Sequence, residues 1–168
     1  MAKNNSYCVN GLRLTVITKV GGENMSIGIK VKIRLDYRGY QKPSKFFFGG
    51  KNINEVAEEM RDQQVAMLRN VPLQGISIEE VDMSGDVYAV YDEFIGADVS
   101  FAPVILTITA DSLEDVIRFI AREEFKKIEI IQPESMTLSK NDIERVLFRV
   151  SEELRGYRLT LDRKYNSR

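Results

Sequence analysis

The stretch from residue 27 to residue 38 constrains the fold of this chain more than any other segment. Its apolar side chains recur at every second position, and successive side chains of a β-strand point to opposite faces. The apolar set consists of Ile27, Ile29, Val31, Ile33, Leu35 and Tyr37. The positions between them are Gly28, Lys30, Lys32, Arg34, Asp36 and Arg38. The pattern predicts a sheet strand with one buried face and one basic, solvent-facing face.

Shorter patterns predict the remaining elements. The first ten residues are polar and predict an unstructured lead. Strands are expected at 12–16, 46–48, 76–78, 87–91, 104–109, 128–131 and 157–161, with 27–37 and 46–48 forming a hairpin. Helices are expected from 53 to about 70, from 113 to 121 and from 143 to about 154. The first ends before Pro72 and the third at Gly156, whereas Pro133 stops the strand at 128–131. Each helix follows a polar residue paired with an acidic one three positions on, namely Asn52 with Glu55, Asp111 with Glu114 and Ser139 with Asp142.

These elements predict the α+β class, a mixed β-sheet with about three helices packed mainly on one face. The order after residue 103 predicts a C-terminal β-α-β-α-β segment, whose first β-α-β unit favours a parallel strand pair. A length of 168 residues suits a single domain over 1–168. A division into sub-halves 11–102 and 103–168 is the alternative.

The residue types that are missing limit the chemistry. The chain has no histidine, no tryptophan and a single cysteine, Cys8. Catalytic triads that use histidine and Cys/His metal clusters are therefore excluded. We expect a protein that is not an enzyme, with no catalytic residues, no cofactor and no metal site.

The same composition bears on location. No apolar run approaches the ~20 residues that span a bilayer, and the first ten residues carry no apolar signal region. A lone thiol suits a reducing compartment. We expect a cytoplasmic protein with no membrane partner.

Charge is distributed unevenly along the chain. Residues 1–50 hold nine Lys/Arg and two Asp/Glu, whereas residues 51–110 hold three and eleven. Residues 111–168 hold twelve of each, so the net charge is −1. The near-neutral net charge therefore results from a basic segment at 1–50 and an acidic segment at 51–110 that offset each other.

The basic end supplies the candidate binding residues. They are Lys30, Lys32, Arg34, Arg38, Lys42 and Lys45. A surface of this kind attracts nucleic-acid phosphates or an acidic protein partner. The more ordinary interpretation is a solvated sheet face whose cations discourage strand pairing. The acidic middle could also pair with this face, within one molecule or across two copies.

Other candidate sites have weaker signatures. Gly49-Gly50-Lys51 precedes a helix, as phosphate-binding loops do, but lacks the Walker A spacing. Phe46 to Phe48 could stack on bases, although such aromatics are more often core. The residues present are compatible with catalysis by a pair of carboxylates alone. Five carboxylates could gather around Mg²⁺ or Ca²⁺, namely Asp82, Asp86, Asp92, Glu93 and Asp98.

The function expected from the sequence is a non-enzymatic binding or assembly module that acts through the basic sheet face and the acidic middle region. Its partner would be another protein or a second copy of the chain. The alternative is a nucleic-acid-binding protein that uses the basic hairpin face.

Overall fold

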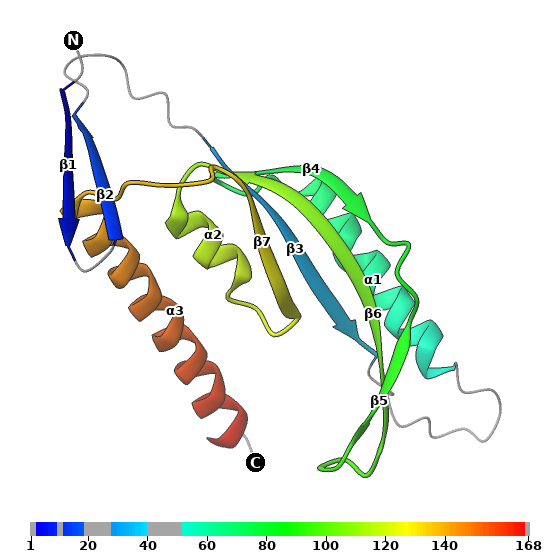
Figure 1. Ribbon diagram of the computed structural model, residues 1–168. Coiled ribbons are helices and arrows are strands. Elements are labelled where there is room, and N and C mark those ends of the chain that lie inside the picture. The colour runs from blue at the N-terminus through cyan, green and yellow to red at the C-terminus, as the bar shows by residue number, and fades with distance from the viewer. Residues whose placement is uncertain (1–2, 10–11, 19–27, 40–51, 167–168) are drawn as a thin grey trace.

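The structure, a computed structural model, describes residues 3–9, 12–18, 28–39 and 52–166 (Figure 1). It contains three helices and seven strands within these ranges, which confirms the α+β class. The helices are α1 (Ile53–Asn70), α2 (Leu113–Ile120) and α3 (Lys140–Asn166). The strands are β1 (Lys3–Val9), β2 (Leu12–Thr18), β3 (Ile29–Arg38), β4 (Ile76–Asp82), β5 (Tyr88–Asp92), β6 (Ala97–Ala110) and β7 (Phe125–Gln132).

The main sheet has the order β4-β6-β3-β7, and β5 pairs with the first part of β6. Every strand pair in it is antiparallel, so the prediction of a mixed sheet is wrong. β6 and β7 do run in the same direction, but β3 lies between them. Units β3-α1-β4 and β6-α2-β7 are therefore two interleaved split β-α-β units, the arrangement called ferredoxin-like.

β1 and β2 form a separate two-stranded antiparallel sheet. The expected strand at 12–16 is therefore confirmed. The prediction of an unstructured lead is wrong, because residues 3–9 pair with 12–18. Polar residues form a strand readily when a neighbouring strand satisfies their backbone groups. The expected strand at 46–48 lies outside the described residues.

The core lies on one face of the main sheet. The alternating apolar residues of β3 are buried from Ile29 to Tyr37, as the sequence pattern predicts. They form one cluster with Val65 of α1 and with Val116 and Phe119 of α2. Both helices therefore cover the same face. None of the described helices packs on the opposite face, which carries the polar side chains of β3.

Local signals at the helix starts explain where α1, α2 and α3 begin. The Asn52 side chain accepts a hydrogen bond of 3.2 Å from the Asn54 amide. Ser112, rather than the predicted Asp111, caps α2, because its hydroxyl accepts from the Asp115 amide at 3.2 Å. Ser139 caps α3 with Asp142, as predicted.

The C-terminal segment departs from the prediction. The order β6-α2-β7-α3 fits the expected strand-helix-strand-helix sequence, but the final strand at 157–161 is helix. Gly156 lies inside α3 without a positive φ, so it does not end the helix. Tyr157, Leu159 and Leu161 fit a period of two over this short window, yet the same window also fits a helix. The helix prevails because its backbone hydrogen bonds are local and need no neighbouring strand.

Among the described residues, no helix combines the length and the apolar character that crossing a membrane requires.

Candidate binding surfaces

The helix-free face of the main sheet holds four of the six predicted binding residues. Lys30, Lys32, Arg34 and Arg38 lie at alternate positions of β3, opposite the buried set. Lys42 and Lys45 lie outside the described residues, as do Gly49-Gly50-Lys51 and the Phe46–Phe48 aromatics. The basic row of β3 is therefore the part of the predicted site that can be examined directly.

Carboxylates from the acidic middle meet this row at one end. The Lys30 ammonium lies 2.5 Å from Oε2 of Glu79, which belongs to the edge strand β4. The Thr109 hydroxyl donates a hydrogen bond of 2.5 Å to the other oxygen of the same carboxylate. These two contacts, Lys30 first, hold the pKa of Glu79 below its ordinary value. The Lys30 charge is thus directly engaged by a residue of the acidic segment.

A second cluster lies further along β3. Nε of Arg34 donates to Oδ1 of Asp36 at 2.8 Å, and the Tyr88 hydroxyl donates to Oδ2 at 2.5 Å. Asp36 is only 2% exposed, so these bonds offset the cost of burying its charge. The hydrogen bond from Arg34 to Asp36 raises the pKa of the guanidinium. Burial, and then the hydrogen bond to Asp36, raises the pKa of Tyr88.

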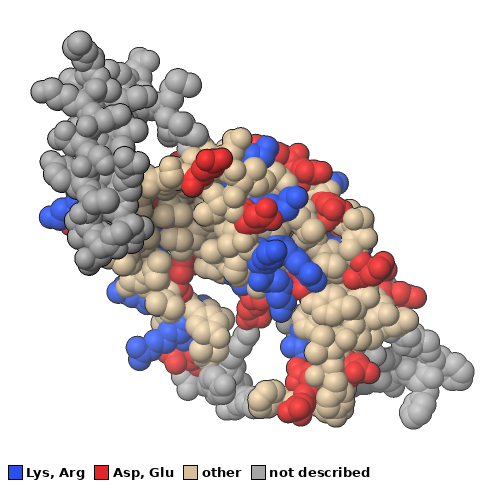
Figure 2. Space-filling view, in the orientation of Figure 1, with Lys and Arg blue, Asp and Glu red and all other residues tan. Residues whose placement is uncertain are grey.

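The remaining two cations of the row, Arg38 and Lys32, also lie near carboxylates. A terminal nitrogen of Arg38 lies 3.4 Å from Oδ2 of Asp92 at the end of β5. Lys32 is exposed, and its charge contributes to a lowered pKa of Asp82, after the larger effect of hydrogen bonds from Ser84. Over the sheet in Figure 2, blue and red side chains adjoin one another, and neither colour covers it alone. Lys30, Arg34 and Arg38 therefore each lie beside a carboxylate of the same chain, and the partners of Lys30 and Arg38 belong to the acidic segment.

A small aromatic patch borders the second cluster. The rings of Tyr88 and Phe101 stack with centroids 5.6 Å apart. The Lys126 ammonium lies 5.3 Å from the centre of the Phe101 ring, within cation–π range. The patch offers contact area, but its cations are already in contact with rings or carboxylates.

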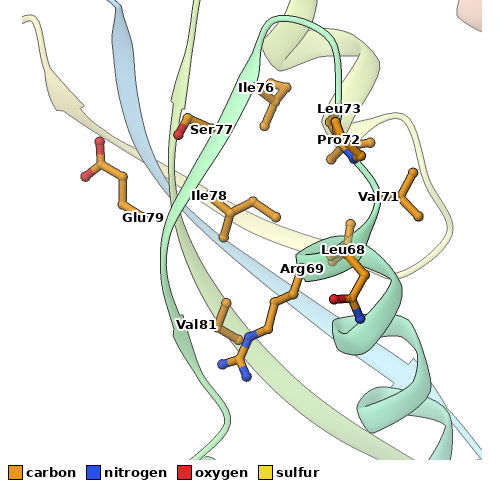
Figure 3. A pocket seen from close by; sticks show the side chains of 11 residues that line it. Leu68, Arg69, Val71, Pro72, Leu73, Ile76, Ser77, Ile78, Glu79 and Val81 are labelled. Carbon is orange, nitrogen blue, oxygen red and sulfur yellow. The ribbon is translucent and has the colours of Figure 1, made fainter.

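A shallow cavity of about 380 Å³ lies between the end of α1 and the edge strand β4 (Figure 3). Its apolar lining residues are Leu68, Val71, Pro72, Leu73, Ile76, Ile78 and Val81. The ionisable side chains among its described lining residues are Arg69 and Glu79, and Lys30 holds the latter. Its described lining brings no acid–base pair together.

The five acidic residues considered for metal binding do not form a cluster. Within the described ranges, no three Cys, Asp or Glu side chains converge in a way that could hold a metal ion. Asp82 instead accepts from the Ser84 amide at 2.9 Å, and Asp92 accepts from the Phe94 amide at 3.0 Å. These carboxylates stabilise the turns at the ends of β4 and β5.

The surface that sequence reasoning missed lies on α3. Seven large apolar side chains of this helix are exposed. Phe148 and Leu159 lie on other sides of the helix, whereas the remaining five follow one stripe and are between 39% and 64% exposed. We name this stripe the α3 row. It consists of Ile143, Leu147, Val150, Leu154, Tyr157 and the half-buried Leu161. The predicted helix end at Gly156 divided this row in two, which concealed its length.

Within the part of the chain that the structure describes, α3 packs by a different face from the α3 row. α3 packs against α2, and Arg145 donates to Glu114 of α2 at 2.7 Å. The partly buried side chains of α3 near this contact are Asp142, Val146, Arg149 and Glu153. At 3.6 residues per turn, these positions lie about a quarter turn from the row. The row is therefore directed sideways from the domain, where Leu154 and Tyr157 border an open hollow beside the end of α2.

No family model, curated protein or solved structure matches this chain. Its function must therefore be inferred from its surfaces.

Proposed function

We propose that this chain is a non-enzymatic binding and assembly module, and that it binds protein through the α3 row. The observation that carries the proposal is the exposure of five large apolar side chains along one stripe of a single helix. Contiguous apolar surface of this kind is covered in soluble proteins by a partner, because removing it from water is favourable. A helix laid against another apolar surface is a common mode of protein recognition.

The electrostatics of the sheet support a protein partner over a nucleic acid. Lys30, Arg34 and Arg38 each have a carboxylate of the same chain within 3.4 Å. A phosphate would have to compete with these carboxylates for each cation, which weakens the counterion-release term that drives nucleic-acid binding. The basic face and the acidic middle, which the sequence suggested as contact surfaces, serve in this proposal chiefly to hold β3, β4 and β5 together.

Site-specific photocrosslinking in the native host tests the proposal. A photoreactive residue at position 154 lies in the row, and one at 159 lies on the opposite side of α3 with similar exposure. We expect a protein adduct from position 154 that disappears when Leu147→Glu is added, and none from position 159. Absence of any row-dependent protein adduct would overturn the proposal.

A salt titration with duplex DNA and single-stranded RNA tests the alternative. We expect no binding whose affinity rises as the salt concentration is lowered. Tight, salt-dependent binding that is lost on charge reversal of Lys30, Lys32 and Arg34, but unchanged by Leu154→Glu, would favour a nucleic-acid-binding function instead.

A further inference from the structure

The spacing within the α3 row is that of a helix-pairing seam. The steps between its six members are four, three, four, three and four residues, so that each of two alternating sets recurs at intervals of seven. Two apolar sets that each repeat every seven residues form the seam along which helices pair and supercoil. Leu147, Leu154 and Leu161 occupy one set of seam positions, and Ile143, Val150 and Tyr157 occupy the other. The row therefore indicates another helix as its partner.

The charges beside the row are self-complementary. Arg158 and Glu144 lie on one flank, and Glu153 lies on the other. If a second α3 runs antiparallel, Arg158 meets Glu144 of the partner subunit. If it runs parallel, Arg158 meets Glu153 of the partner subunit, since flanking positions pair across such a seam. In either direction the arginine faces a glutamate. Lys140 lies 3.6 Å from Glu144 and Arg149 lies 3.7 Å from Glu153 within the helix, but an ionised carboxylate can accept from a second cation as well.

The polar side chains of α3 argue against a lipid surface as the occupant. Helices that lie on membranes are rich in Lys and Arg on their polar face. Residues 140–166 instead carry seven basic and five acidic residues. Several of them pair within the helix, as Arg149 does with Glu152 at 3.0 Å and Lys140 with Glu144 at 3.6 Å. Mixed charge of this kind is typical of helices that pair with helices.

We infer that the occupant of the α3 row is the α3 row of a second copy, so that two chains associate side by side along this helix. The inference rests on the proposed function and names the partner within it. A two-fold arrangement places the same patch of both subunits in contact. Among the described elements, α2 packs on α3 about a quarter turn from the row and so does not cover it.

Sedimentation of the full chain over a range of concentrations tests the inference. The chain has a mass of 19.2 kDa, and we expect a reversible shift to the mass of a dimer. One helix pair is a small interface, so we expect a Kd of about 1–100 μM. A chain that stays monomeric at several hundred micromolar overturns the inference.

Matched leucine substitutions locate the interface. Leu154→Glu should raise the dimer Kd by about 30-fold or more, since it places a charge in the seam. Leu159→Glu changes a leucine of similar exposure outside the row and should alter the dimer Kd by less than about threefold. Far-ultraviolet circular dichroism should show that both variants remain folded. A dimer that tolerates Leu154→Glu overturns the inference.

Charge exchange identifies the direction of pairing. Arg158→Glu should weaken the dimer by about two- to fivefold, because it sets two like charges against each other. Adding Glu144→Arg should restore it in an antiparallel pair, and adding Glu153→Arg should restore it in a parallel pair. Either rescue supports pairing of the two rows, whereas failure of both overturns the flanking contacts that led us to a second copy.

The photocrosslinking described above separates this inference from the proposed function. A row-dependent adduct with the mass of two copies supports both. A row-dependent adduct with a different protein leaves the proposed function standing and overturns self-pairing. Binding to vesicles containing anionic lipid that is lost in Leu154→Glu, without any protein adduct, overturns both.

Discussion

The hydroxyl of Tyr88 donates a hydrogen bond of 2.5 Å to Oδ2 of Asp36, and this bond joins β5 to the centre of the basic strand. The two residues are 52 positions apart in the chain. The same carboxylate also accepts a hydrogen bond from Arg34, so its buried charge is compensated from both sides. The predominantly basic face of β3 thus contains a buried carboxylate that its own arginine and a tyrosine of β5 stabilise.

This relationship predicts a stability effect. Asp36→Asn keeps the shape of the side chain but removes the charge, and we expect it to lower the free energy of unfolding by about 1–3 kcal/mol. Tyr88→Phe removes one hydrogen bond and should cost about 1 kcal/mol. Urea denaturation followed by circular dichroism measures both. Equal stability of Asp36→Asn and the unmodified chain would show that the buried charge contributes nothing.

The pairing of Lys30 with Glu79 predicts a dependence on pH. Because the folded state lowers the pKa of Glu79 below 4.5, its unfolded state binds a proton more readily. Its contribution to stability is therefore fully present above about pH 4.5 and is lost as the pH falls through the folded pKa. Glu79→Gln should flatten the fall in unfolding free energy between neutral and acidic pH. Glu93→Gln in the β5–β6 turn is the control, and an identical flattening in both variants would contradict the assignment.

The conformation of Gly156 predicts a gain in stability. The glycine lies inside α3 with no positive φ, and a Cβ there would meet nothing within 4 Å. Gly156→Ala should therefore stabilise the helix by about 0.5–1 kcal/mol. Gly96→Ala is the matched contrast, since φ at Gly96 is +70° and alanine there should destabilise by about 1 kcal/mol. Destabilisation by Gly156→Ala would mean that the helix ends where the sequence first suggested.

The central position of β6 predicts the largest loss. Leu106 is fully buried between β3 and β4, so Leu106→Ala should lower the free energy of unfolding by about 2–5 kcal/mol through cavity formation. Leu159→Ala on the exposed side of α3 should stay within about 0.5 kcal/mol of the unmodified chain. Thermal and urea unfolding provide the comparison. A small effect at Leu106 would indicate that the core repacks around the missing side chain.

Features that depend only on residues close together in the chain could be predicted from the sequence. The alternation from Ile29 to Tyr37 predicted both the buried and the open face of β3, because side-chain direction in a strand follows position alone. The helix starts near Asn52 and Ser139 were predictable for the same reason, since a cap is made within three residues. The uneven charge distribution was also evident, and one of its proposed explanations was pairing inside the molecule.

Contacts between residues far apart in the chain could be identified only from the tertiary structure. Strand order decides which carboxylates meet which cations, and β4 reaches Lys30 only because the two β-α-β units interleave. The predicted end of α3 was wrong because residues 157–161 fit both the two-residue period of a strand and the period of a helix. The local sequence does not distinguish the two. The sequence by itself determined an α+β protein with one strand basic on its open face. The tertiary structure decided that this face is neutralised from within and that the apolar surface left open lies on α3, because both outcomes depend on contacts between segments far apart in the chain.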